Sequence, residues 1–416
     1  MNTEKNADVL VIGAGPSGTI AASIIRQAGY KVIIVEKMKF PRFVIGESLL
    51  PRCMEALEEA RFLDAVKANG FQRKDGAKFV MYDGKVCDFN FSQQFTDGWK
   101  WTWQVPRASF DKTLADECEK MNIPILYETE VTGITINGDH SLTTVKTADG
   151  HTETIRAKFI VDGSGYGRVI PRLFGLEKPS TQAPRKAVFC HISDPKRAEA
   201  YEPNRIIAYI HNKKTWVWAI PFSNGNTSLG FVSDPEFFEQ YKGNLTEQYR
   251  QLIDAIPYLK ERFGEAELQW EEPRLLQSWS ATTDKFYGEG FVLTGNVTEF
   301  LDPIFSSGVT LASVSAQIAA KLVIQHLKGE TVDWENDYMK RMQKGVDVFR
   351  TYVNCWYDGT LFNIFFTPDP NPEIMSQICS VLAGYVWDES NPFVKNHEKN
   401  LRTLGRFLET KMAAAE

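Results

Sequence analysis

Three patterns in the 416-residue chain predict an α/β fold, in which a Rossmann-like nucleotide-binding domain is interleaved with an antiparallel-sheet substrate domain. A β-branched run, a glycine turn and an apolar helix open the sequence. Strand-to-glycine patterns return near residues 157 and 289, and strand-like runs of alternating polarity lie between them. After about residue 335 the periodicity becomes helical, which predicts a C-terminal helical segment.

The glycine turn near the N-terminus has the context of a dinucleotide-binding fingerprint. Gly13, Gly15 and Gly18 follow a strand and open a helix, and Glu36 ends the next strand-like run. The first glycine allows the tight turn, the second lets a pyrophosphate approach the backbone, and the third permits close helix–strand packing. Unpaired N–H groups at the helix N-terminus attract the anion. Glu36 would accept hydrogen bonds from ribose hydroxyls, so the sequence predicts a bound dinucleotide without a 2′-phosphate.

Two later segments decide which dinucleotide is expected. "AKFIVDGSGYGR" (157–168) leads a strand into Asp162, and "EGFVLTGNVTEFLDPIFSSGVTLASVSAQIAAKLV" (289–323) leads another strand through Gly295 into a long helix. Two distant returns to one nucleotide site suit a long, extended cofactor. They favour FAD over NAD.

Composition excludes several classes of function. A hydrophobic content of 43% and a charged content of 24% are those of a globular protein, and a net charge of -6 offers no footprint for nucleic acid. The apolar run at the N-terminus leads directly into the glycine turn, unlike a secretory signal, and the six cysteines are scattered. Serines and a glutamine interrupt 308–323, which predicts a buried helix instead of a membrane span. A cytoplasmic protein without a metal site is expected.

The alternation of patterns divides the chain into six segments. The FAD-binding domain is expected at 1–85, 111–175 and 286–335, the substrate domain at 86–110 and 176–285, and the helical segment at 336–416.

Four stretches carry a resemblance to known flavoproteins. "WQVPRASFDKTLADECEK" (103–120) is similar to the arginine-containing segment of the FAD-binding fold of the para-hydroxybenzoate hydroxylase type. "KFPRFVIGESLLP" (39–51), "WVWAIP" (216–221) and "FLDPIFSSGVTLA" (300–312) resemble flavin-dependent halogenases that act on phenols and pyrroles. The resemblance spans roughly residues 5 to 330.

The resemblance implies how the flavin is held. Beside the fingerprint residues, the implied FAD-binding residues are Arg42, Ser48, Arg107, Asp162, Gly295, Asn296, Pro303 and Gly308. The group usually carries Gly-Asp where this chain has Gly295-Asn296, and asparagine keeps the hydrogen-bonding capacity without the charge. A weakened hold on FAD would suit a protein that receives reduced flavin, and no second nucleotide fingerprint for NADPH follows the first. A separate flavin reductase is therefore expected as a partner.

The halogenase resemblance also implies a halide site and a lysine. In such enzymes reduced flavin, oxygen and chloride or bromide yield hypohalous acid, which a lysine positions against the substrate. Ser306, Ser307 and Gly308 open a helix whose N–H groups would attract a halide, although the same groups could face the flavin ring. By position, Lys74 resembles the lysine of the phenol and pyrrole halogenases and Lys78 that of the tryptophan halogenases, with a solvated strand-edge lysine as the alternative for each.

Trp216 and Trp218 stand two residues apart on a predicted strand, so their indoles share one face. The resemblance implies that they form a coplanar wall between flavin and substrate, which would suppress direct hydroxylation. The alternative is plain core packing, and reductases of prenyl chains have a similar strand. The tryptophan-type halogenases carry a glutamate at a position comparable to the apolar pair Ile304-Phe305, so the resemblance implies that free tryptophan is a poor candidate substrate.

Four readings of the activity follow. An FAD-dependent halogenase acting on an aromatic or carrier-tethered substrate is favoured, ahead of a hydroxylase, a double-bond reductase and a non-catalytic flavin-binding protein. His191 and His211 have no acid at a recognisable spacing and are expected in the core or at the surface. The aromatic residues at 362–366 fit either a lid over the substrate chamber or ordinary packing of the helical segment.

Overall fold

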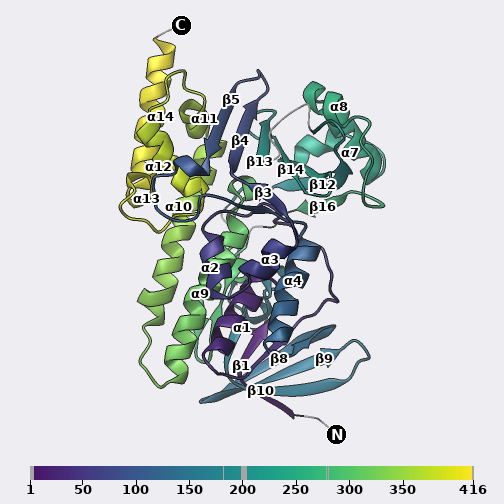
Figure 1. The fold of residues 1–416 in the computed structure, drawn as a ribbon, viewed down its shortest axis with the longest axis vertical. Helices are drawn as coiled ribbons and strands as arrows, with labels where there is room; N and C mark the ends of the chain where they lie inside the picture. Colours follow the sequence, from purple (N-terminus) through teal and green to yellow (C-terminus); the bar gives the residue numbers. More distant parts are fainter. Residues whose placement is uncertain (1–3, 181, 198–203, 278, 280, 415–416) are drawn as a thin grey trace.

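The computed structural model describes residues 4–180, 182–197, 204–277, 279 and 281–414. The described part of the chain forms an elongated body with a sheet in each half (Figure 1). The larger sheet and the N-terminus lie at the lower end, the second sheet lies above it, and the C-terminal helices run along one side.

The larger sheet is the nucleotide-binding one. Its parallel strands run in the order β19-β10-β1-β2-β7, and β18, β8 and β9 extend it with antiparallel pairs. The strands are β1 (Glu4–Ile12), β2 (Val32–Val35), β7 (Ile125–Leu126), β8 (Thr129–Asn137), β9 (His140–Thr147), β10 (Thr152–Asp162), β18 (Tyr287–Gly288) and β19 (Phe291–Leu293). Ile12, Val35, Asp162 and Leu293 end in register, so the loops that follow four parallel strands meet at one edge.

Helices cover this sheet and fix the loops at its edge. α1 and α9 pack against each other, and α4 packs on α1 and α3. These helices are α1 (Pro16–Gln27), α2 (Cys53–Glu59), α3 (Leu63–Ala68), α4 (Arg107–Lys120) and α9 (Ser307–Leu327). By length and composition α9 could cross a membrane, but 78% of its most apolar window is buried inside the molecule, as in the core helix of a folded domain.

The second sheet has the order β16-β12-β15-β14-β13-β4-β5 and is antiparallel except for the parallel pair β13–β4. Its strands are β4 (Gly76–Met81), β5 (Val86–Asn90), β12 (Lys186–Ser193), β13 (Arg205–Ile210), β14 (Trp216–Pro221), β15 (Asn226–Ser233) and β16 (Arg274–Gln277). The chain thus enters this sheet at β4, ahead of the boundary expected at residue 85. The interleaved α/β architecture is confirmed.

The alternation along β14 divides two cores. Val217 and Ala219 face a core that includes residues of α7 (Leu245–Asp254) and α8 (Pro257–Phe263). Trp216 and Trp218 face the opposite, larger core, which continues into the nucleotide-binding half. Period-two alternation on this strand therefore aims both indoles toward the junction of the two sheets.

The remaining described elements are short connections and the C-terminal helices. The connections include β3 (Gln72–Lys74), η1 (Phe91–Gln93), β6 (Thr102–Gln104), α5 (Val169–Phe174), β11 (Glu177–Lys178), β17 (Thr282–Thr283) and 3₁₀ turns at Gly165–Gly167, Pro235–Gln240, Gly295–Val297 and Pro303–Phe305. The C-terminal segment contains η6 (Trp334–Met339), α10 (Lys340–Tyr357), α11 (Thr360–Phe365), α12 (Pro372–Leu382), α13 (Pro392–Lys395) and α14 (His397–Ala413).

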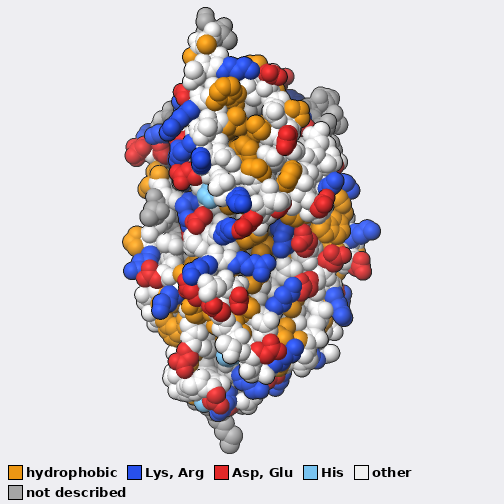
Figure 2. Space-filling model, turned by 90° about the vertical axis from the view of Figure 1, so that its left-hand side faces the viewer, with side chains coloured by type: hydrophobic (Ala, Val, Ile, Leu, Met, Phe, Trp, Pro, Cys, Tyr) orange, Lys and Arg blue, Asp and Glu red, His pale blue; other side chains and the backbone are white. Residues whose placement is uncertain are grey.

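The C-terminal segment is packed onto the second sheet. Phe365 lies 5.0 Å from Phe79 of β4 and 4.9 Å from Phe89 of β5 between ring centroids, and Phe362 lies 4.8 Å from Trp356. On the face formed by this side of the molecule, basic and acidic side chains are interspersed and hydrophobic ones gather near the top (Figure 2). The helical segment is therefore joined to the sheet by an aromatic core.

Candidate functional site

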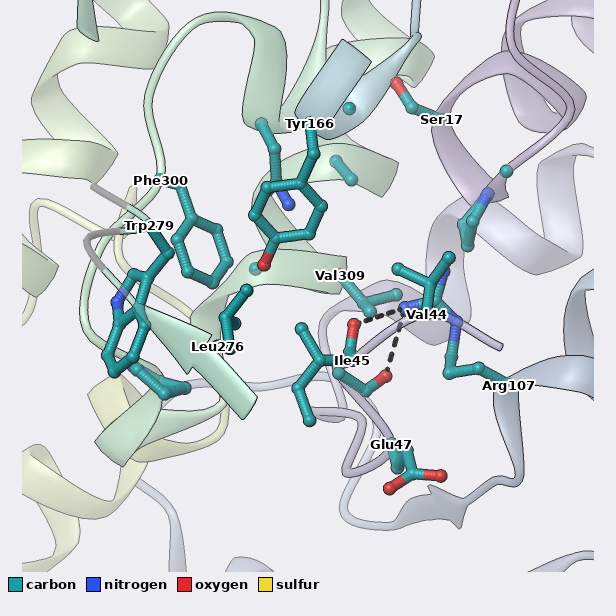
Figure 3. A pocket seen from close by; sticks show the side chains of 18 of the residues that line it. Ser17, Val44, Ile45, Glu47, Arg107, Tyr166, Leu276, Trp279, Phe300 and Val309 are labelled. Atoms are coloured by element: carbon teal, nitrogen blue, oxygen red, sulfur yellow. Dashed lines mark hydrogen bonds between the residues drawn. The ribbon is translucent and has the colours of Figure 1, made fainter. Parts of the chain in front are cut away.

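A cavity of about 340 Å³ opens where the parallel strands of the larger sheet end. Its wall combines the fingerprint loop, segments 42–48, 163–167 and 294–312, and three residues of β14. Figure 3 shows side chains from these distant segments pointing toward the shared space, among them Tyr166, Phe300, Ile45 and Val309. The returns of the chain that the sequence predicts do meet at one site.

The fingerprint glycines have distinct geometric roles. Gly13 has a φ of +93°, and a Cβ there would lie 2.7 Å from the Gly163 carbonyl oxygen. A Cβ on Gly18 would lie 1.9 Å from the Gly13 oxygen, so that position admits no side chain. At Gly15 the nearest atom to an added Cβ is Arg42 Nη2 at 3.5 Å, and the residue lines the cavity. Two glycines build the turn and the third leaves room for a ligand beside the N-terminus of α1.

Acidic and basic side chains fix the loops around this opening. Glu36 Oε2 accepts a hydrogen bond from the Ala14 N–H at 2.8 Å, and Glu36 Oε1 accepts one from the Met38 N–H at 2.9 Å. Arg42 Nη1 lies 2.6 Å from Asp111 Oδ2. The carboxylate of Glu36 is thereby oriented by backbone donors while it remains in the cavity wall.

Arg107, at the start of α4, secures the segment before the "GESLLP" stretch. It forms a two-point pair with Asp111 at 2.8 and 2.9 Å, and its Nη1 donates to the Ile45 carbonyl at 3.0 Å (Figure 3). Burial by itself would lower the pKa of Arg107, but the adjacent Asp111 carboxylate outweighs this effect, so the pKa of Arg107 is raised. Arg107 therefore stays charged and holds the 45–46 backbone against the cavity.

Asp162 is placed behind the cavity instead of in its wall. Its carboxylate accepts hydrogen bonds from the Ser164 N–H at 3.0 Å and the Ile170 N–H at 2.7 Å. Complete burial raises the pKa of Asp162. Its place in the structure is that of a loop anchor, which shapes the 163–167 turn whose residues face the cavity.

The segment before α9 supplies the remaining predicted residues. Asn296, Pro303, Ser306 and Gly308 line the cavity, whereas Gly295 packs on α9, where an added Cβ would lie 3.1 Å from Ala312 Cβ. Ser307 is buried at the first position of the helix. Ser306 has a φ of +57°, a left-handed conformation uncommon for serine, and caps the 21-residue α9. The helix N-terminus therefore faces the cavity through Ser306 and Gly308.

Unpaired polar atoms show what kind of ligand this wall suits. Ser48 Oγ and Tyr166 Oη are buried, find no hydrogen-bond partner among the described residues, and belong to residues that line the cavity. Buried polar atoms of this kind are normally paired. Together with the open cradle at Gly15, the acid at Glu36 and the helix N-terminus, they fit a long nucleotide with a polar ring system.

A second cavity, of about 20 Å³, shares part of its wall with the first. Lys74, Lys78, Phe79 and Phe305 are among its lining residues. Trp216, Ile206 and Ser306 line both cavities. The space is about that of one water molecule. Trp216 thus belongs to the wall shared by the large cavity and a small one that is lined by both predicted lysines.

Lys74 is an unusual lysine. Its side chain is 1% exposed, and Nζ donates a hydrogen bond to the Leu49 carbonyl at 2.7 Å and lies 5.5 Å from the centroid of the Phe91 ring. In the part of the chain that the structure describes, Lys74 forms no ion pair. Burial lowers the pKa of Lys74 to about 7, so the amine and the ammonium coexist near neutral pH. Lys78 is half-buried on β4.

The two tryptophans share one face of β14, as the spacing predicts, but they are not coplanar. Their rings are tilted by 50° with centroids 5.9 Å apart. Each indole N–H has its own acceptor: Trp216 donates to Tyr357 Oη at 3.0 Å and Trp218 to Ser228 Oγ at 3.1 Å. Because these acceptors lie on different elements, the two rings are turned differently, and the expectation of a flat double wall is wrong.

One pair of titratable groups at the cavity was not predicted from the sequence. Glu47 is 1% exposed and lines the cavity, and its Oε1 lies 2.6 Å from His191 Nε2 of β12. His191 also packs on Trp270 with a centroid distance of 4.2 Å. The two partners are 144 positions apart, so no local spacing could connect them. Among the described residues, no group of three His, Cys, Asp or Glu side chains could hold a metal ion.

Comparisons with known proteins agree with this geometry. A family model described as an FAD binding domain matches residues 6–340. A crystal structure of a flavoprotein/dehydrogenase from Cytophaga hutchinsonii is 54% identical, with a TM-score of 0.96 and coverage of 98% of this chain and 100% of that one.

Two curated relatives carry more specific names. The 1H-pyrrole-2-carbonyl-[peptidyl-carrier protein] brominase of Pseudoalteromonas luteoviolacea is 27% identical over 397 residues, which cover 93% of this chain and 94% of the relative. The corresponding chlorinase of Pseudomonas fluorescens is 24% identical over 412 residues, with coverage of 92% and 90%. The predictions of FAD as cofactor and of a halogenase-like architecture are confirmed. The chain belongs to the FAD binding domain family and is an FAD-dependent oxidoreductase of the halogenase-like type.

Proposed function

We propose that this enzyme halogenates an electron-rich aromatic ring, a phenol or a pyrrole, with chloride or bromide as the halogen source. The observation that carries the proposal is the position of Trp216 in the wall shared by the cavity of about 340 Å³, called the FAD cavity, and the cavity of about 20 Å³ lined by Lys74, called the Lys74 cavity. A hydroxylase needs its substrate beside the flavin, whereas a halogenase needs the two kept apart and a group that handles the oxidant on the substrate side. The names of the two carrier-protein relatives support a substrate tethered to a carrier, with a free ring as the other form to test.

When bound, reduced FAD would supply two electrons that bring oxygen to the peroxide level, at which it can oxidise the halide to hypohalous acid with release of water. The chain's own groups have separable tasks around it. Backbone N–H groups at the start of α9, near Ser306 and Gly308, favour an anion. Trp216 excludes water and substrate from the FAD cavity. Lys74 Nζ, balanced between amine and ammonium near neutral pH, can bind the oxidant or exchange a proton with it.

The small size of the Lys74 cavity means that an aromatic substrate needs a change in the structure to enter. About one water fits in 20 Å³, so an aromatic ring cannot enter until neighbouring side chains move. Phe79 and Phe305 line this cavity and also contact each other and Trp356 of α10. We infer that substrate binding opens this aromatic cluster, and that the C-terminal segment takes part in admission of the substrate.

A second candidate is a flavin-dependent dehydrogenase or reductase. The relative of 54% identity is named a flavoprotein/dehydrogenase, and a Lys74 cavity too small for an aromatic ring favours a reaction carried out within the FAD cavity itself. In that case the aromatic substrate would lie beside Tyr166, Phe300 and Trp279, and Lys74 would have no part in turnover.

The test supplies reduced FAD through a separate flavin reductase, with oxygen and bromide, to a panel of phenols, pyrroles and pyrrole-2-carbonyl carrier protein. Brominated product, identified by mass spectrometry, is expected from the parent and from Lys78→Met, and none from Lys74→Met. Both variants should bind FAD as the parent does. If the parent yields only hydroxylated, dehydrogenated or reduced product, halogenation is not its activity.

A further inference from the structure

A chain of hydrogen bonds joins the wall tryptophan to the C-terminal segment. Trp216 Nε1 donates to Tyr357 Oη at 3.0 Å, and Tyr357 Oη donates to Asp302 Oδ2 at 2.9 Å. Tyr357 is the last residue of α10 and lies beyond residue 340, where the match to the FAD binding domain ends. Three segments that are far apart in the sequence therefore meet at the wall between the two cavities.

Asp302 links this chain to the loop in front of α9. Its other oxygen, Oδ1, accepts a hydrogen bond from the Ile304 N–H at 3.1 Å and so shapes the turn at Pro303–Phe305. That turn leads to Ser306, which lines both cavities. A single carboxylate, 2% exposed, thus fixes the turn that carries Ser306 and accepts from the tyrosine that holds Trp216.

The direction of the hydrogen bonds follows from what each group can do. An indole N–H can only donate, and an ionised carboxylate can only accept, so the Tyr357 hydroxyl must accept from Trp216 and donate to Asp302. The Arg185 guanidinium lies over the Tyr357 ring, 3.8 Å from its centroid, and packs against it. The orientation of the Tyr357 hydroxyl is therefore fixed, because its oxygen accepts one hydrogen bond and its proton makes the other.

We propose that Asp302 and Tyr357 are positioning residues that hold the Trp216 indole as the wall between the FAD cavity and the Lys74 cavity. The C-terminal helical segment then completes the active site instead of only covering the second sheet. The catalytic consequence rests on the proposed function, in which that wall keeps the substrate away from the flavin. The positioning itself does not depend on which product is made.

The charge of Asp302 makes this device sensitive to pH. Burial raises the pKa of Asp302 to about 6, against the smaller opposing effects of the Tyr357 hydroxyl, the Ile304 N–H and Arg185. Arg185 also forms an ion pair with Asp234, and Asp234 Oδ2 lies 2.9 Å from Lys214 Nζ. Above this pKa the carboxylate is a strong acceptor for the tyrosine, and below it the acceptor weakens. The hold on Trp216 should loosen as the pH falls through about 6.

The chain offers matched variants for a test on the FAD-loaded enzyme. Tyr357→Phe removes the linking hydroxyl and Asp302→Asn removes the charge. Tyr352→Phe is the control, because Tyr352 is buried in the same helix and donates instead to the Phe393 carbonyl at 3.4 Å. Ser228→Ala removes the acceptor of the neighbouring indole, Trp218.

The first readout is the indole N–H resonance of Trp216 in protein labelled with ¹⁵N-tryptophan, assigned by its loss in Trp216→Phe. It should shift in Tyr357→Phe, stay in place in Tyr352→Phe and Ser228→Ala, and titrate with a midpoint near pH 6 in the parent but not in Asp302→Asn. The second readout is the peroxide released per reduced FAD consumed. We expect a rise of several-fold in Tyr357→Phe and in Asp302→Asn, and little change in the two controls.

The outcomes separate the two proposals. An unmoved Trp216 resonance in Tyr357→Phe would overturn the positioning role. A moved resonance with an unchanged peroxide ratio would overturn its catalytic consequence. If Tyr357→Phe does not fold, Asp302→Asn is judged by the same two readouts. If both readouts change as expected but no substrate is ever halogenated, the positioning role stands and the halogenase proposal falls.

Discussion

The two cavities on either side of Trp216 are built in different ways. The FAD cavity is made mainly of loops that follow strand ends, with backbone groups and glycines in its wall, and each of its segments is a short contiguous motif. The Lys74 cavity is made of side chains from β3, β4, β13, β14, the turn before α9 and α12, most of them apolar. The first is a binding site for a charged nucleotide, and the second is a small, mostly apolar space beside the buried amine of Lys74.

This difference shows where specificity and reactivity reside. A nucleotide can be held by backbone geometry, which a few glycines specify. A lysine whose pKa falls to about 7 needs a whole shell of apolar neighbours, because desolvation is the largest cause of the shift. Substitutions should therefore affect the two cavities differently, and Trp216, which belongs to both, should have the widest effect.

The largest effect on stability is expected from the wall. Trp216→Ala and Trp218→Ala each open a cavity around a nearly fully buried side chain, 2% and 4% exposed, and should lower the free energy of unfolding by about 3–5 kcal/mol. Because Trp216 alone of the two lines both cavities, its loss should also raise peroxide release more than the loss of Trp218. Chemical unfolding and peroxide assays measure the two effects.

Val217→Ala is the control for the wall, since Val217 is equally buried but faces the opposite core. It should lower stability while leaving flavin reoxidation unchanged. If Val217→Ala and Trp216→Ala release equal amounts of peroxide, Trp216 is an ordinary core residue and does not act as a wall.

The next largest effect separates the FAD cavity from the Lys74 cavity. Gly15→Val places a branched side chain in the opening beside α1, where FAD phosphates must approach, and should weaken FAD binding by about 100-fold or more, equivalent to about 2.7 kcal/mol. Titration of the apoprotein with FAD gives the affinity. Gly133→Val, on the remote strand β8, should bind FAD like the parent, and normal affinity in Gly15→Val would contradict the fingerprint assignment.

A smaller effect, of opposite sign, is expected at Lys74. Each pKa unit corresponds to about 1.4 kcal/mol, so burying this ammonium is costly, and the hydrogen bond to Leu49 offsets only part of the cost. Lys74→Met should raise the free energy of unfolding at pH 7 by about 2 kcal/mol while abolishing halogenated product. Urea unfolding and product analysis on one preparation test both.

The pH dependence of stability tests whether burial lowers the pKa of Lys74. The unfolded chain keeps the Lys74 proton up to its ordinary pKa of 10.5, whereas the folded protein releases it near 7. Between these values the unfolded state binds more protons, so the stability of the parent should rise with pH across that interval. Lys74→Met should lack this part of the rise, and identical pH profiles for the two proteins would argue against a desolvated lysine.

The smallest effect is expected at the second lysine. Lys78 lines the same cavity but is only half-buried, so Lys78→Met should change stability by no more than about 0.5 kcal/mol. Product formation should fall far less than in Lys74→Met. A larger loss of product in Lys78→Met, measured under the same conditions, would exchange the roles proposed for the two lysines.

The nucleotide-binding half of this protein could be predicted from the amino-acid sequence. Glycines at 13, 15 and 18 and the acid at 36 constrain the backbone within one β-α-β unit, where local spacing is enough to place them. The shared face of Trp216 and Trp218 likewise follows from the two-residue period of a strand. Such features depend on local geometry alone.

The assembly of the Trp216 wall and its surroundings could not be predicted and depends on the packing of distant segments. Neither the 50° tilt of the indoles, nor the Glu47–His191 pair, nor the bonds from Trp216 through Tyr357 to Asp302 could be read from spacing, because each joins strands, loops or helices that are distant in the chain. The burial of Lys74 depends in the same way on neighbours contributed by several elements. Desolvation and hydrogen bonding between distant segments exist only once the chain is packed, and they set the chemistry of the groups they enclose.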